Sequence, residues 1–267
     1  MANIAKLMGT PIGNFTKVMG VLKSTLNKIM GMGLSLGVPV SGAVLHIDAS
    51  LLGTGTGINA ATTPVSNHGS QGGSFNSGTY DVVASGIGTK NALKFNGTDQ
   101  HLKSTNAYSN TGTTLTMFIV QQRISDKGNY SGSLACLKAG DADDYDLTRN
   151  FTHHQLPTTG NMGGQRTFAD LPGLTHPGNG VSAINTFKFD NTNCTHYQRT
   201  TSTDTNASVA STGSFDCTDT ILAARWYSGA VNSRNNIYIG EVLIYNSALN
   251  DTDREAVENY LASKWGI

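Results

Sequence analysis

The sequence is poor in charge, in glutamate and in cysteine. Charged residues make up 13% of its 267 residues, against roughly 25% in an average soluble domain. Lys and Arg together number 18 and balance 18 Asp and Glu, so the formal net charge is zero. Because proteins that bind nucleic acids carry a basic excess, this balance argues against a nucleic-acid partner.

The chain has only three cysteines, Cys136, Cys194 and Cys217. An odd number without paired spacing does not fit a disulfide framework or a zinc site. The expectation is therefore three reduced thiols in a protein made in a cytosol, with a Cys194–Cys217 bridge as the alternative.

Long hydrophobic runs are also missing. No stretch approaches the roughly 18–20 apolar residues that span a bilayer, so we expect no membrane span. At the N-terminus Lys6 is followed by Gly9, Pro11 and Gly13, which leaves no unbroken apolar core for a signal peptide. We expect a soluble protein that is not secreted by a signal peptide.

What the sequence has instead is glycine, threonine, serine and asparagine, with 31 glycines and 38% apolar residues. Asn and Gly adopt turn conformations and Thr favours strands, so this composition predicts short strands joined by many turns. Residues 113–122 (TTLTMFIVQQ) have the continuous apolar centre that is typical of a strand buried on both faces. Residues 236–246 are another expected strand.

Two hairpins are predicted. Residues 184–190 and 194–199 are strand-like and flank a turn at 191–193. Residues 91–95 and 101–104 flank the dipeptide Asn96-Gly97, which is a strong hairpin signal.

One helix is predicted, at the C-terminus. Asn250 or Asp251 can cap its first turn. One apolar stripe runs along it, formed by Val257, Tyr260, Leu261 and Trp265. Many strands and a single amphipathic helix predict a β-sandwich or jelly roll.

Three stretches resemble the concanavalin A-like lectin/glucanase (laminin G-like) jelly-roll family: NALKFNGTDQHL (91–102), LTMFIVQQ (115–122) and IGEVLIYNSALNDTDREAVENYLASKWGI (239–267). The resemblance covers residues 43–267 and is densest at the C-terminus. The matching positions there are Glu241, Leu249, Tyr260, Leu261, Lys264, Trp265 and Gly266. What it implies is an all-β fold of two packed, curved antiparallel sheets.

The enzymes of that family resemble one another in a strand that carries Glu-x-Asp-x-x-Glu, and this sequence lacks the motif. Glycoside hydrolysis generally needs two carboxylates across the scissile bond. Glu255 and Glu258 lie in the predicted helix and Glu241 stands alone in its strand, so we expect no catalytic residues and no enzyme. Glu241 is expected to be structural, bonding to nearby backbone or to the helix region.

One acidic cluster, DADDYD, spans residues 141–146. Asp141, Asp143, Asp144 and Asp146 have a spacing that suits a hard cation, and Ca²⁺ takes 6–8 oxygen ligands. The stretch lacks the glycine and the distal glutamate of an EF-hand loop. The four aspartates are therefore either a solvated acidic loop or a Ca²⁺ site, and the expected function requires no cofactor.

Three histidines could be considered as metal ligands or acid–base groups. His153 and His154 are adjacent, and adjacent side chains of a strand point to opposite faces, so the two would not bind one ion together. We expect them, with His176, to be polar strand or loop residues.

A glycan-binding site needs less than an active site, because polar loops and an aromatic face are sufficient. Tyr145, Trp226 and Tyr227 are the candidates for glycan contact. Core or rim residues of the same types would look identical in sequence.

Residues 3–35 consist of three copies of an eleven-residue unit. Each copy keeps a lysine, a methionine and a glycine at fixed positions: Lys6, Met8, Gly9, Lys17, Met19, Gly20, Lys28, Met30 and Gly31. Eleven residues make three helical turns, which would favour a right-handed coiled coil. A glycine in every copy costs about 1 kcal/mol in a helix, so short strands that end in a glycine turn fit better.

Such units cannot bury their apolar face alone, which makes this segment a good docking arm. Tandem units of this kind before a lectin-like jelly roll resemble an arrangement found in structural proteins of tailed-bacteriophage virions. We therefore expect residues 1–35 to be an anchoring arm, 36–42 a linker and 43–267 the jelly-roll domain.

The expected protein is a virion structural protein, either a capsid decoration or a tail- or fibre-associated protein. Its arm would bind other virion proteins, its jelly roll would face outward and contact host-surface glycans, and the chain would be a homo-oligomer assembled in the host cytoplasm. The alternatives are a stand-alone carbohydrate-binding module, a membrane-active N-terminal peptide and, last, a glycosidase.

Overall fold

The computed structural model describes residues 37–104, 109–157 and 159–267. The chain divides into two units, Met1–Pro39 and Val40–Ile267. The predicted anchoring arm, residues 1–35, lies outside the described residues, and residues 37–44 contain no helix or strand.

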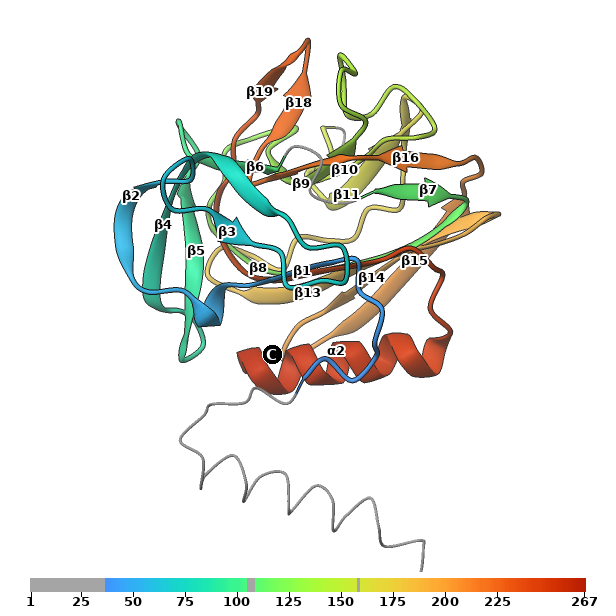
Figure 1. The fold of residues 1–267 in the computed structure, drawn as a ribbon. Helices are drawn as coiled ribbons and strands as arrows, with labels where there is room; N and C mark the ends of the chain where they lie inside the picture. Colours follow the sequence, from blue (N-terminus) through green and yellow to red (C-terminus); the bar gives the residue numbers. More distant parts are fainter. Residues whose placement is uncertain (1–36, 105–108, 158) are drawn as a thin grey trace, which may run out of the picture. The chain divides into compact units, whose positions relative to one another are not determined.

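The unit Val40–Ile267 is built on one antiparallel sheet of 16 strands that curls into two facing halves (Figure 1). The first half contains, in spatial order, β12 (Ala169–Asp170), β11 (Met162–Arg166), β10 (Phe151–Gln155), β9 (Gly132–Leu137), β17 (Asp219–Leu222) and β6 (His101–Ser104). The second half contains β5 (Lys90–Asn96), β20 (Asn236–Tyr245), β8 (Thr114–Ser125), β13 (Ser182–Asp190), β14 (Asn193–Arg199) and β15 (Asp204–Ala210), with β1 (Leu45–Asp48) beside β20.

The long strand β4 (Ser74–Ile87) joins the two halves. Its first part pairs with β6 and its second part with β5, while β2 (Gly55–Asn59) and β3 (Val65–Ser66) pair with its other edge. Two small sheets complete the strands: β7 (Asn110–Gly112) with β16 (Phe215–Cys217), and β18 (Arg225–Tyr227) with β19 (Ala230–Asn232). A short 3-10 helix, η2 (Ala49–Leu51), follows β1.

The hairpin predicted at Asn96-Gly97 is wrong. β5 and β6 do not pair with each other but pair in succession with β4, running in the same direction. The side chain of Asn96 accepts hydrogen bonds from the backbone N–H groups of Thr98, Asp99 and Gln100, and Gly97 has a φ of +69°. Residues 97–100 therefore form a small closed loop, after which the chain resumes its path along β4. The second predicted hairpin is confirmed by the pairing of β13 with β14.

Aromatic residues fill the space between the two halves. The ring of Phe151 on β10 lies 5.0 Å from that of Phe187 and 5.5 Å from that of Phe189, both on β13. The sulfur atoms of Met117 on β8 and Cys136 on β9 are 3.9 Å apart. The domain is thus a β-sandwich whose core lies between β9–β10 and β8–β13.

The helix α2 (Asp251–Trp265) covers the outer side of β8 and β13 (Figure 1). The side chain of Asn250 caps its first turn by accepting from the N–H of Asp253 at 2.9 Å. Val257, Leu261 and Trp265 are buried beneath it. This third layer explains why β8 is buried on both faces, as predicted. An all-β domain with one C-terminal helix is confirmed.

The three cysteines are all among the described residues, and each is a buried thiol. The Cys194–Cys217 bridge is therefore not formed. Within the described residues, no helix combines the length and the apolar character that crossing a membrane would require.

Candidate functional site

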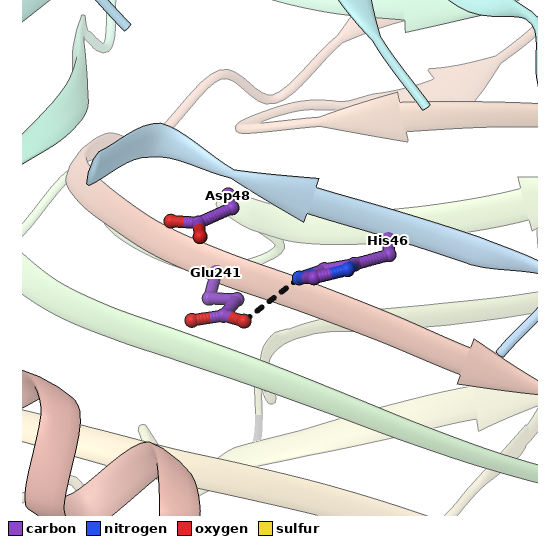
Figure 2. Close-up of side chains that lie close together, drawn as sticks. All are labelled: His46, Asp48 and Glu241. Carbon is purple, nitrogen blue, oxygen red and sulfur yellow. Dashed lines mark hydrogen bonds and ion pairs between the residues drawn. The ribbon is translucent and has the colours of Figure 1, made fainter. Parts of the chain in front are cut away.

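Two strands bring a histidine and two carboxylates together beside the C-terminal helix. Antiparallel pairing of β1 with β20 sets Asp48 opposite Glu241, and His46 lies on the same face of β1 as Asp48. The Nε2 atom of His46 is 2.8 Å from Oε1 of Glu241 (Figure 2). Among the residues that the structure describes, only this trio of His, Cys, Asp or Glu side chains has all its ligand atoms within 4.8 Å of one another.

A lysine from the helix already supplies the positive charge that this trio needs. The Nζ atom of Lys264 lies 2.7 Å from Oε2 of Glu241 and also donates to Asp48. The indole Nε1 of Trp265 donates to the same Glu241 oxygen at 2.8 Å. Burial acts to lower the pKa of Lys264, but the carboxylates outweigh it and raise the pKa above its ordinary value. The two carboxylates therefore hold α2 against the sheet, a role that suits this trio better than metal binding. Glu241 bonds to the helix, as expected.

The acidic stretch 141–146 does not converge on one point. The carboxylate of Asp141 pairs with the guanidinium of Arg149, and Asp143 accepts a backbone N–H at 2.8 Å. Asp144 is buried, and Oδ1 of Asp146 is buried without a hydrogen-bond partner. The four aspartates do not place three ligand atoms within 4.8 Å of one another, so the Ca²⁺ site stays a prediction.

Asp144 forms a buried ion pair with Arg225 at the start of β18. The Nη2 atom of Arg225 is 2.6 Å from Oδ1 of Asp144, and the two side chains are 5% and 0% exposed. The other carboxylate oxygen accepts from the backbone N–H of Trp226 at 2.8 Å. Burial raises the pKa of Asp144, and the guanidinium opposes that shift. The pair ties the acidic loop to the hairpin β18–β19.

That hairpin is closed by Ser228 and Gly229, which have φ values of +52° and +73°. Two successive residues with positive φ are the requirement of a two-residue hairpin turn whose twist matches its strands. The hairpin projects beyond the ends of β9 and β10 (Figure 1). It thereby places Tyr227 next to the acidic loop.

A cleft of about 350 Å³ opens between this hairpin, the acidic loop, β11 and the loop before β9. We call it the aromatic cleft, and its lining residues are Tyr130, Tyr145, Gln165, Arg225, Tyr227, Asn232 and Ser233.

Aromatic rings dominate the cleft. The rings of Tyr145 and Tyr227 are nearly parallel, with an interplanar angle of 19° and centroids 6.5 Å apart. Phe168 packs edge-on against Tyr145 at 5.3 Å. Tyr227 is 51% exposed and Phe168 is 69% exposed. Large aromatic side chains are normally buried, so their gathering at the surface makes this cleft a candidate binding surface.

Polar groups lie among these rings. The amide nitrogen of Gln165 donates to Asp170, and Oδ1 of Asn232 accepts from the N–H of Ser233. Within the described part of the chain, Oε1 of Gln165 and Nδ2 of Asn232 have no hydrogen bond. The cleft therefore offers one amide acceptor and one amide donor beside flat apolar faces.

Two of the three predicted glycan-contact residues, Tyr145 and Tyr227, lie together in this cleft. Trp226 does not line it. Its indole Nε1 donates to the backbone oxygen of Asp141 at 2.8 Å, and its ring packs on the buried group formed by Ala135, Leu137, Ile221 and Ala224. Trp226 is thus a structural residue of the hairpin.

Four lining residues carry no signal in the sequence: Tyr130, Gln165, Asn232 and Arg225. These residues come from a loop, a strand and a hairpin that are far apart in the chain, and no spacing connects them. The histidines are placed as expected: His153 points into the sandwich toward Gln121, and His154 points the other way, toward Arg225. The predicted anchoring residues lie outside the described residues.

No protein-family model and no curated protein matches the sequence. Solved structures do match. The chain is similar to Trypanosoma rangeli sialidase in complex with sialic acid, with a TM-score of 0.53 and 12% identity over 95% of this chain and 40% of that one. It is similar to a mutant of the same sialidase displaying trans-sialidase activity, with a TM-score of 0.52 and 13% identity over the same shares.

A further match is the Ruminococcus gnavus IT-sialidase CBM40 bound to alpha2,3 sialyllactose, with a TM-score of 0.40 and 16% identity over 56% of this chain and 83% of that one. The chain spans about 40% of the length of the trypanosomal sialidases it matches. At such identities the likeness is one of fold alone, a distant match to the β-domains of sialidases.

Proposed function

We propose that the unit Val40–Ile267 is a carbohydrate-binding domain and that its ligand lies in the aromatic cleft. The observation that carries the proposal is the pair of nearly parallel rings of the exposed Tyr227 and the half-buried Tyr145 beside unbonded amide groups. A pyranose ring has an apolar C–H face and a rim of hydroxyls. Its C–H face packs on the negative face of an aromatic ring, and its hydroxyls bond to the amides of Gln165 and Asn232.

The aromatic cleft is distinguished by its chemistry and not by its size. A larger hollow of about 510 Å³ lies between the loop 174–181 and the ends of β14 and β15. Its lining combines threonine and serine side chains with three aliphatic residues, a histidine and a glutamine, and it contains no Tyr, Trp or Phe ring. A sugar there would find no flat aromatic face on which to stack.

The sandwich and its likeness to sialidase chains support this proposal at the level of architecture, and fold alone does not identify a ligand. We further propose that the domain is of the concanavalin A-like jelly-roll type, as its C-terminal sequence implies. The observed tie between the motif residues Glu241, Lys264 and Trp265 supports that assignment.

The proposed domain binds without turnover. Hydrolysis of a glycosidic bond generally needs two carboxylates that flank it. None of the described residues that line the aromatic cleft is an aspartate or a glutamate. Glu241, the one glutamate of the strands, is buried, and its carboxylate accepts hydrogen bonds from Lys264 and Trp265 of α2.

The virion role stays a prediction, because it rests on residues 1–35, which lie outside the described residues, and no structure named above is a virion protein. It is tested by binding of the full chain, and of the chain from residue 43 onward, to virions. Loss of binding in the shorter chain supports the anchoring arm, and equal binding contradicts it.

A glycan array probed with the full chain tests the carbohydrate proposal. We expect Tyr227→Ala and Tyr145→Ala to weaken the strongest signal at least about tenfold, because each ring is a central contact of the cleft. Leu51→Ala removes an exposed side chain on η2, outside the cleft, and should leave the signal unchanged. Circular dichroism of each variant verifies the fold. Absence of any bound glycan, or equal loss in Leu51→Ala, would overturn the proposal.

A further inference from the structure

The aromatic cleft contains one cation, Arg225, and the charge of that cation is already compensated. Its Nη2 and Nε atoms both bond to Oδ1 of Asp144, at 2.6 and 3.1 Å. Its Nη1 atom is 3.1 Å from Nδ1 of His154. The side chain is 5% exposed, so the guanidinium is held beneath the surface of the cleft by a buried carboxylate.

Aromatic rings enclose the same guanidinium. Its central carbon lies 4.9 Å from the ring centroid of Tyr145 and 5.6 Å from that of Tyr130. A cation that faces two rings is attracted by their negative faces. The ion pair and the rings together satisfy Arg225, and an incoming carboxylate would have to compete with Asp144 for it.

The imidazole beside Arg225 does not supply a second charge. His154 is buried, and both burial and the neighbouring guanidinium lower its pKa well below the ordinary value. It is therefore neutral at neutral pH. Among the described residues that line the cleft there is no lysine and no second arginine.

The rim of the cleft is acidic. Asp143 accepts the backbone N–H of Ser228 at 2.8 Å, which places its carboxylate beside Tyr227. Burial raises the pKa of Tyr145, the negative charges of Asp143 and Asp146 raise it further, and the guanidinium of Arg225 acts in the opposite direction. The field of these carboxylates thus reaches the ring on which a sugar would stack.

We infer that the aromatic cleft selects neutral glycans and rejects acidic ones, such as sialylated or uronic acid-containing chains. The inference rests on the proposed function and names its ligand class. It also separates this domain from the sialic acid-bound sialidase that shares its fold, because the cleft pairs its only cation internally and carries negative charge at its rim. Like charges brought together at an interface are unfavourable, and they discriminate against the wrong partner.

The test uses the full chain on an array in which each acidic glycan is printed beside its neutral parent, for example α2,3-sialyllactose beside lactose. We expect neutral parents to bind and their acidic derivatives to bind at least about tenfold more weakly at low salt. Raising the salt concentration should reduce this difference in binding, because Asp143 is only half-buried and dissolved ions screen its charge.

Asp143→Asn keeps an acceptor for the N–H of Ser228 and removes one rim charge. Acidic glycans should therefore bind this variant with a signal closer to that of their neutral parents. Asp190→Asn is the matched control, since Asp190 also accepts backbone N–H groups, in the turn between β13 and β14. It should leave the ratio of the two signals unchanged. Equal or stronger binding of acidic glycans through Tyr227 would overturn the inference and leave the carbohydrate proposal standing. Binding of no glycan at all would overturn both.

Discussion

The Nζ atom of Lys264 lies 2.7 Å from Oε2 of Glu241, which ties the last turn of α2 to the middle of β20. The same glutamate accepts from the indole of Trp265 and the phenol of Tyr260. One buried carboxylate therefore receives three of the polar contacts that hold the helix on the sheet, more than any other side chain of the described strands. A single side chain can be changed to test this arrangement.

Glu241→Gln should destabilise the domain by about 1–3 kcal/mol, because Lys264 keeps Asp48 as its charged partner while the buried hydrogen bonds to Glu241 lose their charge. Urea unfolding followed by circular dichroism measures the free energy of unfolding. Glu255→Gln on the same helix is the control. The side chain of Glu255 is 62% exposed, and we expect a change within about 0.5 kcal/mol. A similar small change for Glu241→Gln would contradict the anchoring role.

Gly240→Ala should also loosen the helix, through packing rather than charge. A Cβ atom at residue 240 would lie 2.9 Å from three ring atoms of Trp265, closer than real contacts allow. Overpacking of this kind costs about 1–3 kcal/mol. Gly53→Ala is the matched control, because a Cβ atom at residue 53 meets nothing within 4 Å. Thermal unfolding measures the melting temperatures of both variants. Equal values would contradict the close packing of the Trp265 ring against Gly240 of β20.

The C-terminal part of the fold could be predicted from the sequence because its signals are local. The cap at Asn250, the apolar stripe of α2 and the apolar centre of β8 each lie within one element. The Asn96-Gly97 signal failed for the same reason. The dipeptide does make a tight loop, but the long strand β4 pairs with the chain on both sides of it, and that partner is far away in sequence.

The candidate site was only half visible in the sequence. Tyr145 and Tyr227 could be named as aromatic residues next to polar loops, yet Trp226 was indistinguishable from them. Only the packing shows that alternate side chains of β18 face in different directions, so that Trp226 covers the buried group beneath the hairpin. The contribution of Tyr130 depends on the curl of the whole sheet, which no local pattern specifies.

The thiols give an independent check on the core. Cys194 and Cys217 are buried, and burial raises the pKa of each, so little thiolate forms at neutral pH. With Cys136 also buried, a thiol reagent such as DTNB should react with none of the three in the native protein at pH 8. In denaturant it should titrate all three. Rapid reaction of one thiol in the native protein would contradict the burial of that strand.

The buried histidines predict acid sensitivity. Burial lowers the pKa of His153 to about 4 and that of His196 to about 3, against 6.5 for an exposed imidazole. The folded state therefore keeps both rings neutral while the unfolded chain binds protons below about pH 6.5. The stability they provide is present above that pH and is lost as the pH falls toward 4. Each histidine contributes up to about 1.4 kcal/mol per pH unit in that window.

His153 and His196 should thus lower the free energy of unfolding by about 2–3 kcal/mol between pH 6 and pH 5. His154 and His176, whose pKa values burial also lowers, act in the same direction. Urea titrations at a series of pH values measure the slope. His196→Asn should make the slope shallower by the share of one histidine, whatever it does to stability at pH 7. Leu51→Ala removes an exposed side chain that does not titrate and should leave the slope as it is. A stability that does not change between pH 7 and pH 5 would mean that water reaches these rings, and the packing of His196 on Phe187 at 4.1 Å would then be wrong.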